Sequence, residues 1–144
     1  MPPTNILVVE DEAIVAMEIE QILAGAGYNV VGIADHQREA VEIAKASKLD
    51  LALVDVRLAD GESGLDVAIA LQHLGVPVMF VTGTCPRADG SGIAFACLHK
   101  PFSDRGLLDS VEVLKALIAG EPPAALPPTL HLYDPPAQVP ARAG

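Results

Sequence analysis

The sequence predicts an α/β protein whose core is an open, parallel sheet made of five strand–helix units over residues 5–119. Two observations predict this class. Short runs of branched aliphatic residues alternate along the chain with longer segments whose apolar residues recur at helical spacing. Polar residues also follow directly after several of the short runs, and ligands bind at the carboxyl ends of parallel strands in such sheets.

The first strand is expected at residues 6–9, a continuous aliphatic run typical of a strand buried on both faces. A helix is predicted over residues 13–23, because its apolar residues recur at helical spacing with polar residues between them. Gly25 and Gly27 follow this segment and are expected to end it. The second strand is predicted at residues 29–34.

The middle of the chain continues the alternation. Asp35 is expected to cap a second helix, whose apolar pattern is broken at Ser47-Lys48. Residues 51–54 form the third predicted strand, residues 64–74 the next helix and residues 76–81 the fourth strand. This order places a strand end at Asp55 and another at Thr82.

Residues 83–92 contain three glycines and a proline and are predicted to form a loop in place of a fourth helix. The fifth strand is expected at residues 93–98. Ser103 is a candidate cap for a last helix. The apolar side of that helix is expected to consist of Leu107, Leu108, Val111, Leu114 and Ile118.

We expect one domain at residues 1–120, followed by a proline-rich tail at residues 121–144. The tail holds seven of the twelve prolines and shows no hydrophobic periodicity, so it is predicted to be extended or disordered. Leu130, Leu132 and Tyr133 form a small apolar group within it. They are either incidental residues of a flexible tail or a segment that docks on an exposed face of the domain.

The formal net charge of −10, with nine Lys and Arg residues scattered along the chain, argues against a nucleic-acid partner. No apolar run is long enough to cross a membrane, and the first residues do not resemble a signal peptide. We therefore expect a cytoplasmic protein. Cys85 and Cys97 do not have metal-ligand spacing, and in a reducing compartment both are expected to be free thiols.

Three carboxylates, those of Glu10, Asp11 and Asp55, follow the first and third predicted strands. They should converge at one edge of the sheet, where like charges repel without a counter-ion. Mg²⁺ favours sites with one or two carboxylates, several waters and a phosphate oxygen. The sequence thus predicts a Mg²⁺ site.

Asp55 is the candidate phosphoacceptor of this site. A carboxylate can attack a phosphoryl group when nearby positive charge offsets the negative charge of that group. Lys100 can supply an ammonium, and Thr82 a hydroxyl that donates to a phosphoryl oxygen. Gly83 leaves the approach free of a side chain.

Four segments together resemble the signature of response-regulator receiver domains, and the resemblance covers residues 5–119. They are Ile6-Leu7-Val8-Val9-Glu10-Asp11-Glu12, Leu53-Val54-Asp55-Val56, Phe80-Val81-Thr82-Gly83 and Lys100-Pro101-Phe102. The resemblance implies a flavodoxin-like (CheY-like), doubly wound five-stranded parallel sheet with strand order 2-1-3-4-5.

The resemblance also implies roles for single residues. Asp55 corresponds to the phosphoacceptor and Asp11 to a direct Mg²⁺ ligand, with Glu10 acting through water and Arg57 lending its backbone carbonyl. Thr82 and Lys100 correspond to the phosphoryl-sensing pair. The bond between Lys100 and Pro101 is usually cis in the family. Thr84 and Arg57 flank the site and are expected to tune access of water.

The sequence departs from the family in two places. Cys97 stands where receivers usually have a switch aromatic; Phe95 is expected on the same face of its strand, with a packing role favoured over a switch role. The interval from Thr82 to Lys100 is also shorter than usual. Together with the Phe-x-Thr-Gly motif, this resembles an alphaproteobacterial receiver subgroup with a shortened fourth helix. Pro101 and Phe102 complete the candidate switch surface.

The predicted function is that of a single-domain response regulator in a two-component phosphorelay. It accepts a phosphoryl group from a sensor histidine kinase or a phosphotransfer protein and signals through contacts with a downstream protein. It is a switch, not an enzyme. The alternatives are a phosphate sink without output and a phosphorylation-independent adaptor with the same fold. A flavin-binding protein is disfavoured, because few aromatic residues are available and the first loop is acidic where a phosphate needs donors.

Overall fold

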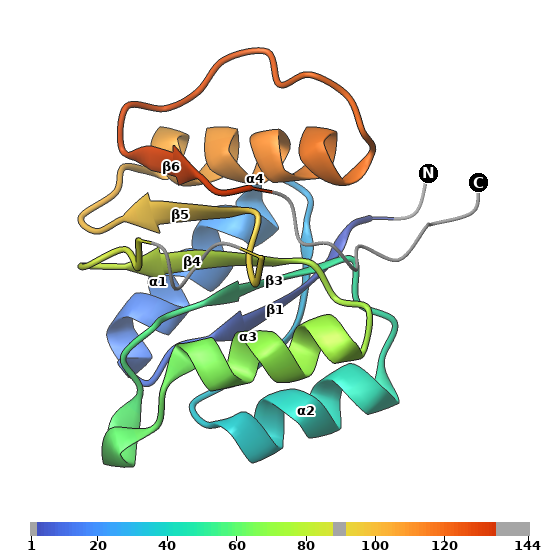
Figure 1. Cartoon of the computed structure of the whole chain (residues 1–144), viewed down its shortest axis with the longest axis vertical. Coiled ribbons are helices and arrows are strands. Elements are labelled where there is room, and N and C mark those ends of the chain that lie inside the picture. Colours follow the sequence, from blue (N-terminus) through green and yellow to red (C-terminus); the bar gives the residue numbers. More distant parts are fainter. Residues whose placement is uncertain (1–2, 88–91, 135–144) are drawn as a thin grey trace.

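A computed structural model describes residues 3–87 and 92–134 as one sheet with helices on both faces (Figure 1). The strands are β1 Asn5–Val9, β2 Asn29–Ala34, β3 Leu51–Val54, β4 Val78–Thr82, β5 Ala96–His99 and β6 Leu130–Leu132. The helices are α1 Ala13–Gly25, α2 Gln37–Ala46, α3 Gly64–His73 and α4 Asp104–Ile118, with a short 3-10 turn at Ala59–Gly61.

The sheet has the strand order β2-β1-β3-β4-β5-β6. Strands β1 to β5 pair in parallel, and β6 pairs with β5 in the antiparallel direction. The predicted order 2-1-3-4-5 is therefore confirmed, with one strand added at its edge. The chain reverses its direction of winding at β1, so the carboxyl ends of β1 and β3 lie side by side at a topological switch point.

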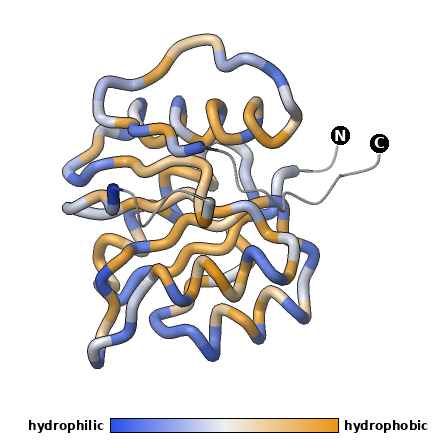
Figure 2. The backbone as a smooth tube through the Cα atoms, viewed as in Figure 1, coloured by the Kyte–Doolittle hydropathy of each residue, from blue (hydrophilic) through white to orange (hydrophobic). Residues whose placement is uncertain are grey.

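Two helix layers enclose the sheet, and each buries its own half of the strand residues (Figure 1). Helices α1 and α4 cover Ile6, Leu53 and other residues of one face. Helices α2 and α3 cover Leu7, Val54 and other residues of the opposite face. Alternating side chains thus feed two apolar layers, and Figure 2 shows the hydrophobic residues concentrated along the central strands.

The ends of the helices follow the sequence with one exception. Helix α1 ends at Gly25, and Gly27 has the positive φ of +91° that suits glycine. Ser103 caps α4 as predicted, since its Oγ accepts from the Gly106 backbone N–H at 2.9 Å. The prediction that Asp35 caps α2 is wrong. His36 occupies the N-cap position, and its side chain makes no capping hydrogen bond.

The connection between β4 and β5 contains no helix in its described parts, residues 83–87 and 92–95. This agrees with the loop predicted from its glycines and proline. Among the described residues of this connection, no helix therefore covers β4 and β5 on the side of α3. Cys85 and Ile93 of the connection and Tyr133 of the C-terminal segment pack against this face instead.

The apolar group at Leu130, Leu132 and Tyr133 docks on the domain. Leu130 is buried, and the flanking backbone bonds join His99 to Thr129 and Tyr133 to Phe95. Of the two interpretations, docking on the domain therefore applies to residues 130–133. Residues 135–144 of the tail lie outside the described residues. The domain boundary at residue 120 stays a prediction.

The expectation of two free thiols is wrong, because Cys85 and Cys97 form a disulfide. The expectation relied on the reducing compartment and on the absence of metal-ligand spacing. The path of the loop could not be known from the sequence. In the structure the loop after β4 turns back over β5 and brings the Cα atoms of Cys85 and Cys97 to 5.9 Å. That separation lies within the range that a disulfide bridges.

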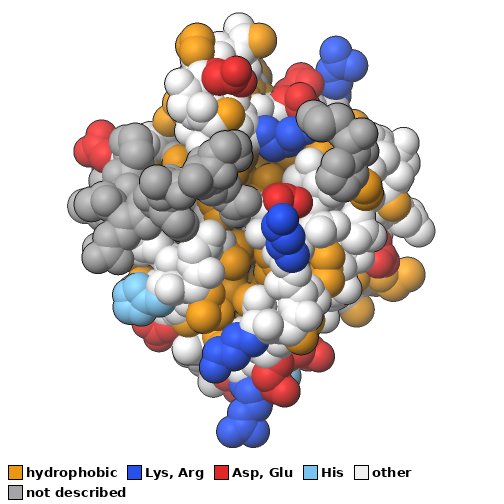
Figure 3. Space-filling view, turned by 90° about the vertical axis from the view of Figure 1, so that its right-hand side faces the viewer, with side chains coloured by type: hydrophobic (Ala, Val, Ile, Leu, Met, Phe, Trp, Pro, Cys, Tyr) orange, Lys and Arg blue, Asp and Glu red, His pale blue; other side chains and the backbone are white. Residues whose placement is uncertain are grey.

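The ends of the strands differ in chemistry. Figure 3 views the molecule from the side on which the parallel strands begin, where acidic and basic side chains are interspersed among apolar and uncharged ones. Among the described residues, none of the helices is both long and apolar enough to cross a membrane. The residues predicted to carry chemistry lie at the opposite end.

Candidate functional site

The polar residues predicted from the strand ends do lie together. Glu10 and Asp11 follow β1, Asp55 follows β3, Thr82 ends β4 and Lys100 follows β5. Carboxylate oxygens of Glu10, Asp11 and Asp55 all lie within 4.8 Å of one another. The parallel sheet delivers these side chains to one edge because all five strands run in the same direction.

Lys100 joins two of the three acids. Its Nζ donates to Glu10 Oε1 at 2.6 Å and to Asp55 Oδ2 at 2.9 Å. The Lys100 side chain is 20% exposed, against 2% for Glu10 and 8% for Asp55. Paired charges at this depth are held by these hydrogen bonds, since an isolated buried carboxylate would be strongly destabilising.

Burial raises the pKa of Glu10 to about 7, against the lowering effect of its hydrogen bonds from Lys100 and from the Glu12 backbone N–H. Burial by itself lowers the pKa of Lys100, but the bonds to Glu10 and Asp55 reverse this and raise it overall. Lys100 is therefore a fixed positive charge. A second positive charge near Glu10 would favour its ionised form further.

The Asp55 carboxylate is oriented from its own loop. Its Oδ1 accepts from the Arg57 backbone N–H at 3.1 Å, while Oδ2 accepts from Lys100. The Asp55 backbone N–H donates to Val9 O at 2.9 Å, which fixes the residue beside β1. The carboxylate is thus held in one orientation before any ligand arrives.

Gly64, which was not among the predicted site residues, determines how close α3 approaches Asp55. A Cβ on Gly64 would lie 1.9 Å from the Asp55 carbonyl oxygen and 2.7 Å from Val56 Cα. The Gly64 N–H donates to Val56 O at 2.7 Å. Its only sequence signal was a glycine at the start of a predicted helix.

A pocket of about 320 Å³ opens over Asp55. Both acidic and hydroxyl side chains line it, together with the Lys100 ammonium. The lining residues are Asp11, Glu12, Asp55, Arg57, Leu58, Thr82, Gly83, Thr84 and Lys100. The pocket therefore combines carboxylates suited to a hard cation with a cation and hydroxyls suited to an anion.

Four predicted switch residues, Phe95, Cys97, Pro101 and Phe102, do not line this pocket. The bond between Lys100 and Pro101 is cis, as the resemblance implied, and Pro101 is exposed. Phe102 packs against the core on the α1 and α4 side. Among the described residues, neither Pro101 nor Phe102 makes a side-chain hydrogen bond to a residue that lines the pocket.

Phe95 does not lie on the same face as Cys97. It precedes β5, so strand alternation does not apply to it, and it packs on the α1 and α4 side with 5% of its surface exposed. Cys97 is fully buried on the α2 and α3 side, opposite Phe80 in the register of β4 and β5. The packing role favoured for Phe95 is thus consistent with its burial.

An aromatic residue does occupy the region near Cys97, but it comes from the tail. The Tyr133 ring stacks edge-on against Phe80, with 6.5 Å between centroids, and the Tyr133 hydroxyl donates to the Pro86 carbonyl oxygen. Burial raises the pKa of Tyr133 to about 12. In the sequence, Tyr133 stands out only as a member of the small apolar group of the tail.

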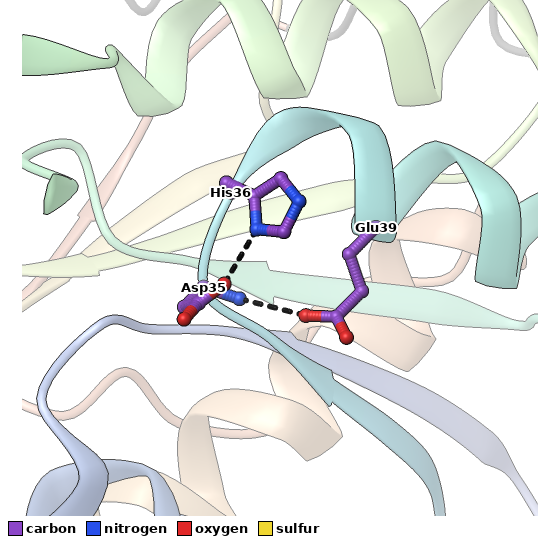
Figure 4. Close-up of side chains that lie close together, drawn as sticks. All are labelled: Asp35, His36 and Glu39. Carbon is purple, nitrogen blue, oxygen red and sulfur yellow. Dashed lines mark hydrogen bonds and ion pairs between the residues drawn. The ribbon is translucent and has the colours of Figure 1, made fainter. Parts of the chain in front are cut away.

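A second group of potential ligands, Asp35, His36 and Glu39, lies at the start of α2 (Figure 4). His36 Nδ1 lies 2.5 Å from Asp35 Oδ1, and the Asp35 backbone N–H donates to Glu39 Oε1 at 3.3 Å. The hydrogen bond to Asp35 raises the pKa of His36. These groups bond to one another and order the first turn of the helix.

Comparison with known proteins agrees with this arrangement. Residues 6–112 match the model of the family described as the response regulator receiver domain. The phyllosphere-induced regulator PhyR of Methylorubrum extorquens is 49% identical over 81 residues, which are 55% of this chain and 30% of PhyR. The transcriptional regulatory protein PdtaR of Mycobacterium tuberculosis is 36% identical over 118 residues, covering 77% of this chain and 56% of PdtaR.

A solved structure shows the same fold. The solution structure of the receiver domain of PhyR from Erythrobacter litoralis superposes with a TM-score of 0.71 at 29% identity, covering 80% of this chain and 92% of that domain. The similarity to PhyR is consistent with the alphaproteobacterial subgroup indicated by the Phe-x-Thr-Gly motif. The chain spans well under two thirds of the two curated relatives' lengths.

Proposed function

Because the chain belongs to the family of response regulator receiver domains, we propose that it is a switch that accepts a phosphoryl group on Asp55. One observation carries the proposal. The Asp55 carboxylate is held by Lys100 Nζ at 2.9 Å and by the Arg57 N–H at 3.1 Å on the floor of a polar pocket. A nucleophile, a charge-stabilising cation and an open approach are therefore present together.

The acids of the pocket fit a Mg²⁺ ion. Receiver domains generally bind Mg²⁺ in an acidic pocket, and here three carboxylates lie within ligand distance of one another around a partly open site. Asp11, Asp55 and the Arg57 backbone carbonyl would hold the ion, with Glu10 acting through water. When bound, the ion neutralises charge on the phosphoryl oxygens and on the surrounding carboxylates.

In the proposed reaction, an Asp55 carboxylate oxygen attacks the phosphorus of a phosphohistidine in a partner kinase or phosphotransfer protein. A P–O bond forms, the P–N bond of the donor breaks, and the bonding pair returns to the donor imidazole. Lys100 then exchanges part of its contact with Asp55 for a contact with a phosphoryl oxygen. The hydroxyl of Thr82, and that of Thr84 beside it, are the donors available on the opposite wall.

Phosphorylation adds negative charge to a site that already holds three acids. The wall formed by residues 82–84 continues directly into the loop between β4 and β5, so a movement of Thr82 toward the phosphoryl group would change the surface of that loop. Signalling through a downstream protein that reads this surface follows from the proposal. The protein undergoes the reaction itself and is in this sense a switch.

A phosphorylation-independent adaptor is the second candidate, and one observation favours it. The position that usually carries the switch aromatic is Cys97, which is covalently bonded to Cys85. A bonded side chain cannot rotate as a free aromatic does. The adaptor would retain the fold and the surface without responding to Asp55.

The test is incubation of the full chain with acetyl phosphate and Mg²⁺, followed by intact mass within minutes. We expect one phosphoryl adduct on the wild type and none on Asp55→Asn. Asp35→Asn is the matched control, because Asp35 also follows a strand but lies outside the pocket. It should be phosphorylated like the wild type. A wild-type protein without adduct, and without Mg²⁺ binding by titration, would leave the adaptor as the better description.

A further inference from the structure

The Cys85–Cys97 disulfide joins the loop that follows β4 to strand β5. Cys85 belongs to the loop after β4, and Cys97 belongs to β5, twelve residues later. Cys97 pairs with Phe80 of β4 on one side and with His131 of β6 on the other. The bond therefore anchors the loop to the middle of a buried strand.

The anchored loop is also a wall of the acidic pocket. Thr82, Gly83 and Thr84 line the pocket, and Cys85 follows them immediately. On the other side of the pocket Lys100 follows β5, whose residue Cys97 carries the second sulfur. A covalent bond thus restrains the segment that would have to move toward a phosphoryl group on Asp55.

Other restraints on the loop are few. Among the described residues, a hydrogen bond joins the Tyr133 hydroxyl to Pro86 O, and the Lys100 N–H donates to Thr82 O at 2.9 Å. Residues 83–87 have no regular secondary structure. Segments with few backbone bonds open at low free energy, so the disulfide should dominate the order of this loop.

The two cysteines differ in accessibility. Cys97 is 0% exposed, whereas Cys85 is half-buried and lines a cavity of about 690 Å³ between the loop and β6. Of the two cysteines, Cys85 is therefore the one that a thiolate in the cavity can approach. The sulfur of the fully buried Cys97 is then the leaving group.

We propose that Cys85 and Cys97 form a thiol–disulfide exchange site for a dithiol reductant, and that its redox state sets the mobility of the loop beside the phosphoacceptor pocket. The coupling to phosphorylation rests on the proposed function. The exchange itself does not. Oxidation locks residues 83–87 to β5, and reduction releases them.

The exchange balances with a dithiol alone. A thiolate of the dithiol attacks the Cys85 sulfur, forms a mixed disulfide and displaces the Cys97 thiolate, which takes a proton. The second thiol of the reductant then attacks the reductant sulfur that is bonded to Cys85. This closes the reductant's own disulfide and releases the Cys85 thiolate, which takes a proton. The protein gains two thiols, and the dithiol is oxidised to a disulfide.

The first experiment needs no phosphoryl group. The full chain is prepared oxidised and reduced with dithiothreitol, and thiol alkylation with intact mass verifies the redox state of the two cysteines in each sample. Hydrogen exchange is then measured over residues 83–87 in both forms. We expect exchange about tenfold faster after reduction, with no change across β1 and β3. Equal exchange in the two forms overturns the proposal, as does failure of dithiothreitol to reduce the native protein.

Cys85→Ser is the matched variant, since it removes the half-buried sulfur and leaves the buried Cys97 in place. It should exchange like the reduced wild type and be insensitive to dithiothreitol. A variant that exchanges like the oxidised wild type would show that the bond does not order the loop, and would count against the proposal.

The coupling is tested with beryllofluoride and Mg²⁺ as the phosphoryl mimic. The mimic should change exchange of residues 83–87 in the reduced protein and in Cys85→Ser, and much less in the oxidised protein. Equal responses in both redox forms overturn the coupling. If the mimic binds none of the forms, the proposed function fails, while the difference between oxidised and reduced protein without the mimic still decides the exchange site.

Discussion

Gly64 lies directly against the backbone of Asp55, so that a Cβ at this position would be 1.9 Å from the Asp55 carbonyl oxygen. No real Cβ tolerates that distance, and the atoms it would meet belong to the backbone. Helix α3 begins at Gly64, and Ser63 caps it by accepting from the Leu65 N–H at 3.1 Å. The start of α3 and the position of the phosphoacceptor candidate are therefore set together.

Gly64→Ala should accordingly displace Asp55 and destabilise the fold by at least about 3 kcal/mol, because the clash is with backbone. Urea unfolding measures the stability, and acetyl phosphate labelling measures the site. Gly25→Ala is the control: it also lies at a helix end, but nothing lies within 4 Å of its added Cβ. It should change stability by no more than about 1 kcal/mol. Equal effects of the two substitutions would contradict the role assigned to Gly64.

The central sheet and the acidic pocket could be predicted from the sequence because each depends on a local pattern. Buried parallel strands are continuous aliphatic runs, and their ends carry Asp55, Thr82 and Lys100 in chain order. Since parallel strands end at one edge, the residues that follow them meet without any knowledge of side-chain packing. Strand β3 was predicted within its observed bounds for this reason.

The parts that could not be predicted depend on tertiary contacts between segments without periodicity. The Cys85–Cys97 bond requires the path of a loop that has no regular structure. Strand β6 has three residues, and its pairing with β5 is fixed by packing of Leu130 and Tyr133. Phe95 was assigned to the wrong face because β5 begins at Ala96, three residues later than the sequence pattern indicated, so Phe95 lies outside the strand.

Mg²⁺ should raise the thermal stability of the protein, because a cation that binds the three acids binds only the folded state. At a concentration 100 times its Kd the gain is about 2.7 kcal/mol. Asp11→Asn removes one ligand from the pocket and should reduce this gain strongly. Asp35→Asn should leave it unchanged, and EDTA should reverse it. Unfolding scans with and without Mg²⁺ provide the measurement, and a gain preserved in Asp11→Asn would exclude Asp11 as a ligand.

The Tyr28–Glu112 hydrogen bond should make the free energy of unfolding depend on pH in the acidic range. The Tyr28 hydroxyl donates to Glu112 Oε2, and this bond holds the pKa of Glu112 below its ordinary 4.5. Because the folded pKa is lowered, the stabilisation is present above that value and is lost as pH falls through the folded pKa.

Tyr28→Phe should therefore cost up to about 1 kcal/mol at pH 7 and almost nothing at pH 3, since Glu112 is largely exposed and its interactions are screened. Urea unfolding of both proteins at the two pH values gives the difference. Glu112→Gln provides the control background, because it keeps an acceptor without the titrating charge. In that background, the cost of Tyr28→Phe should be the same at the two pH values. A cost for Tyr28→Phe that persists at pH 3 would assign the effect to packing of the ring.

The docked segment should contribute measurably to the stability of the whole domain. Leu130 is 9% exposed in the core beside β5, whereas Leu126 in the preceding connection is 50% exposed. Leu130→Ala should therefore lower the free energy of unfolding by about 2–3 kcal/mol, and Leu126→Ala by less than about 0.5 kcal/mol. Leu130→Ala should also speed hydrogen exchange of the β5 backbone at His99, which donates to Thr129 O. Equal stability of the two variants would mean that β6 leaves the edge of the sheet in solution, and β5 would then be the outer strand available to another protein.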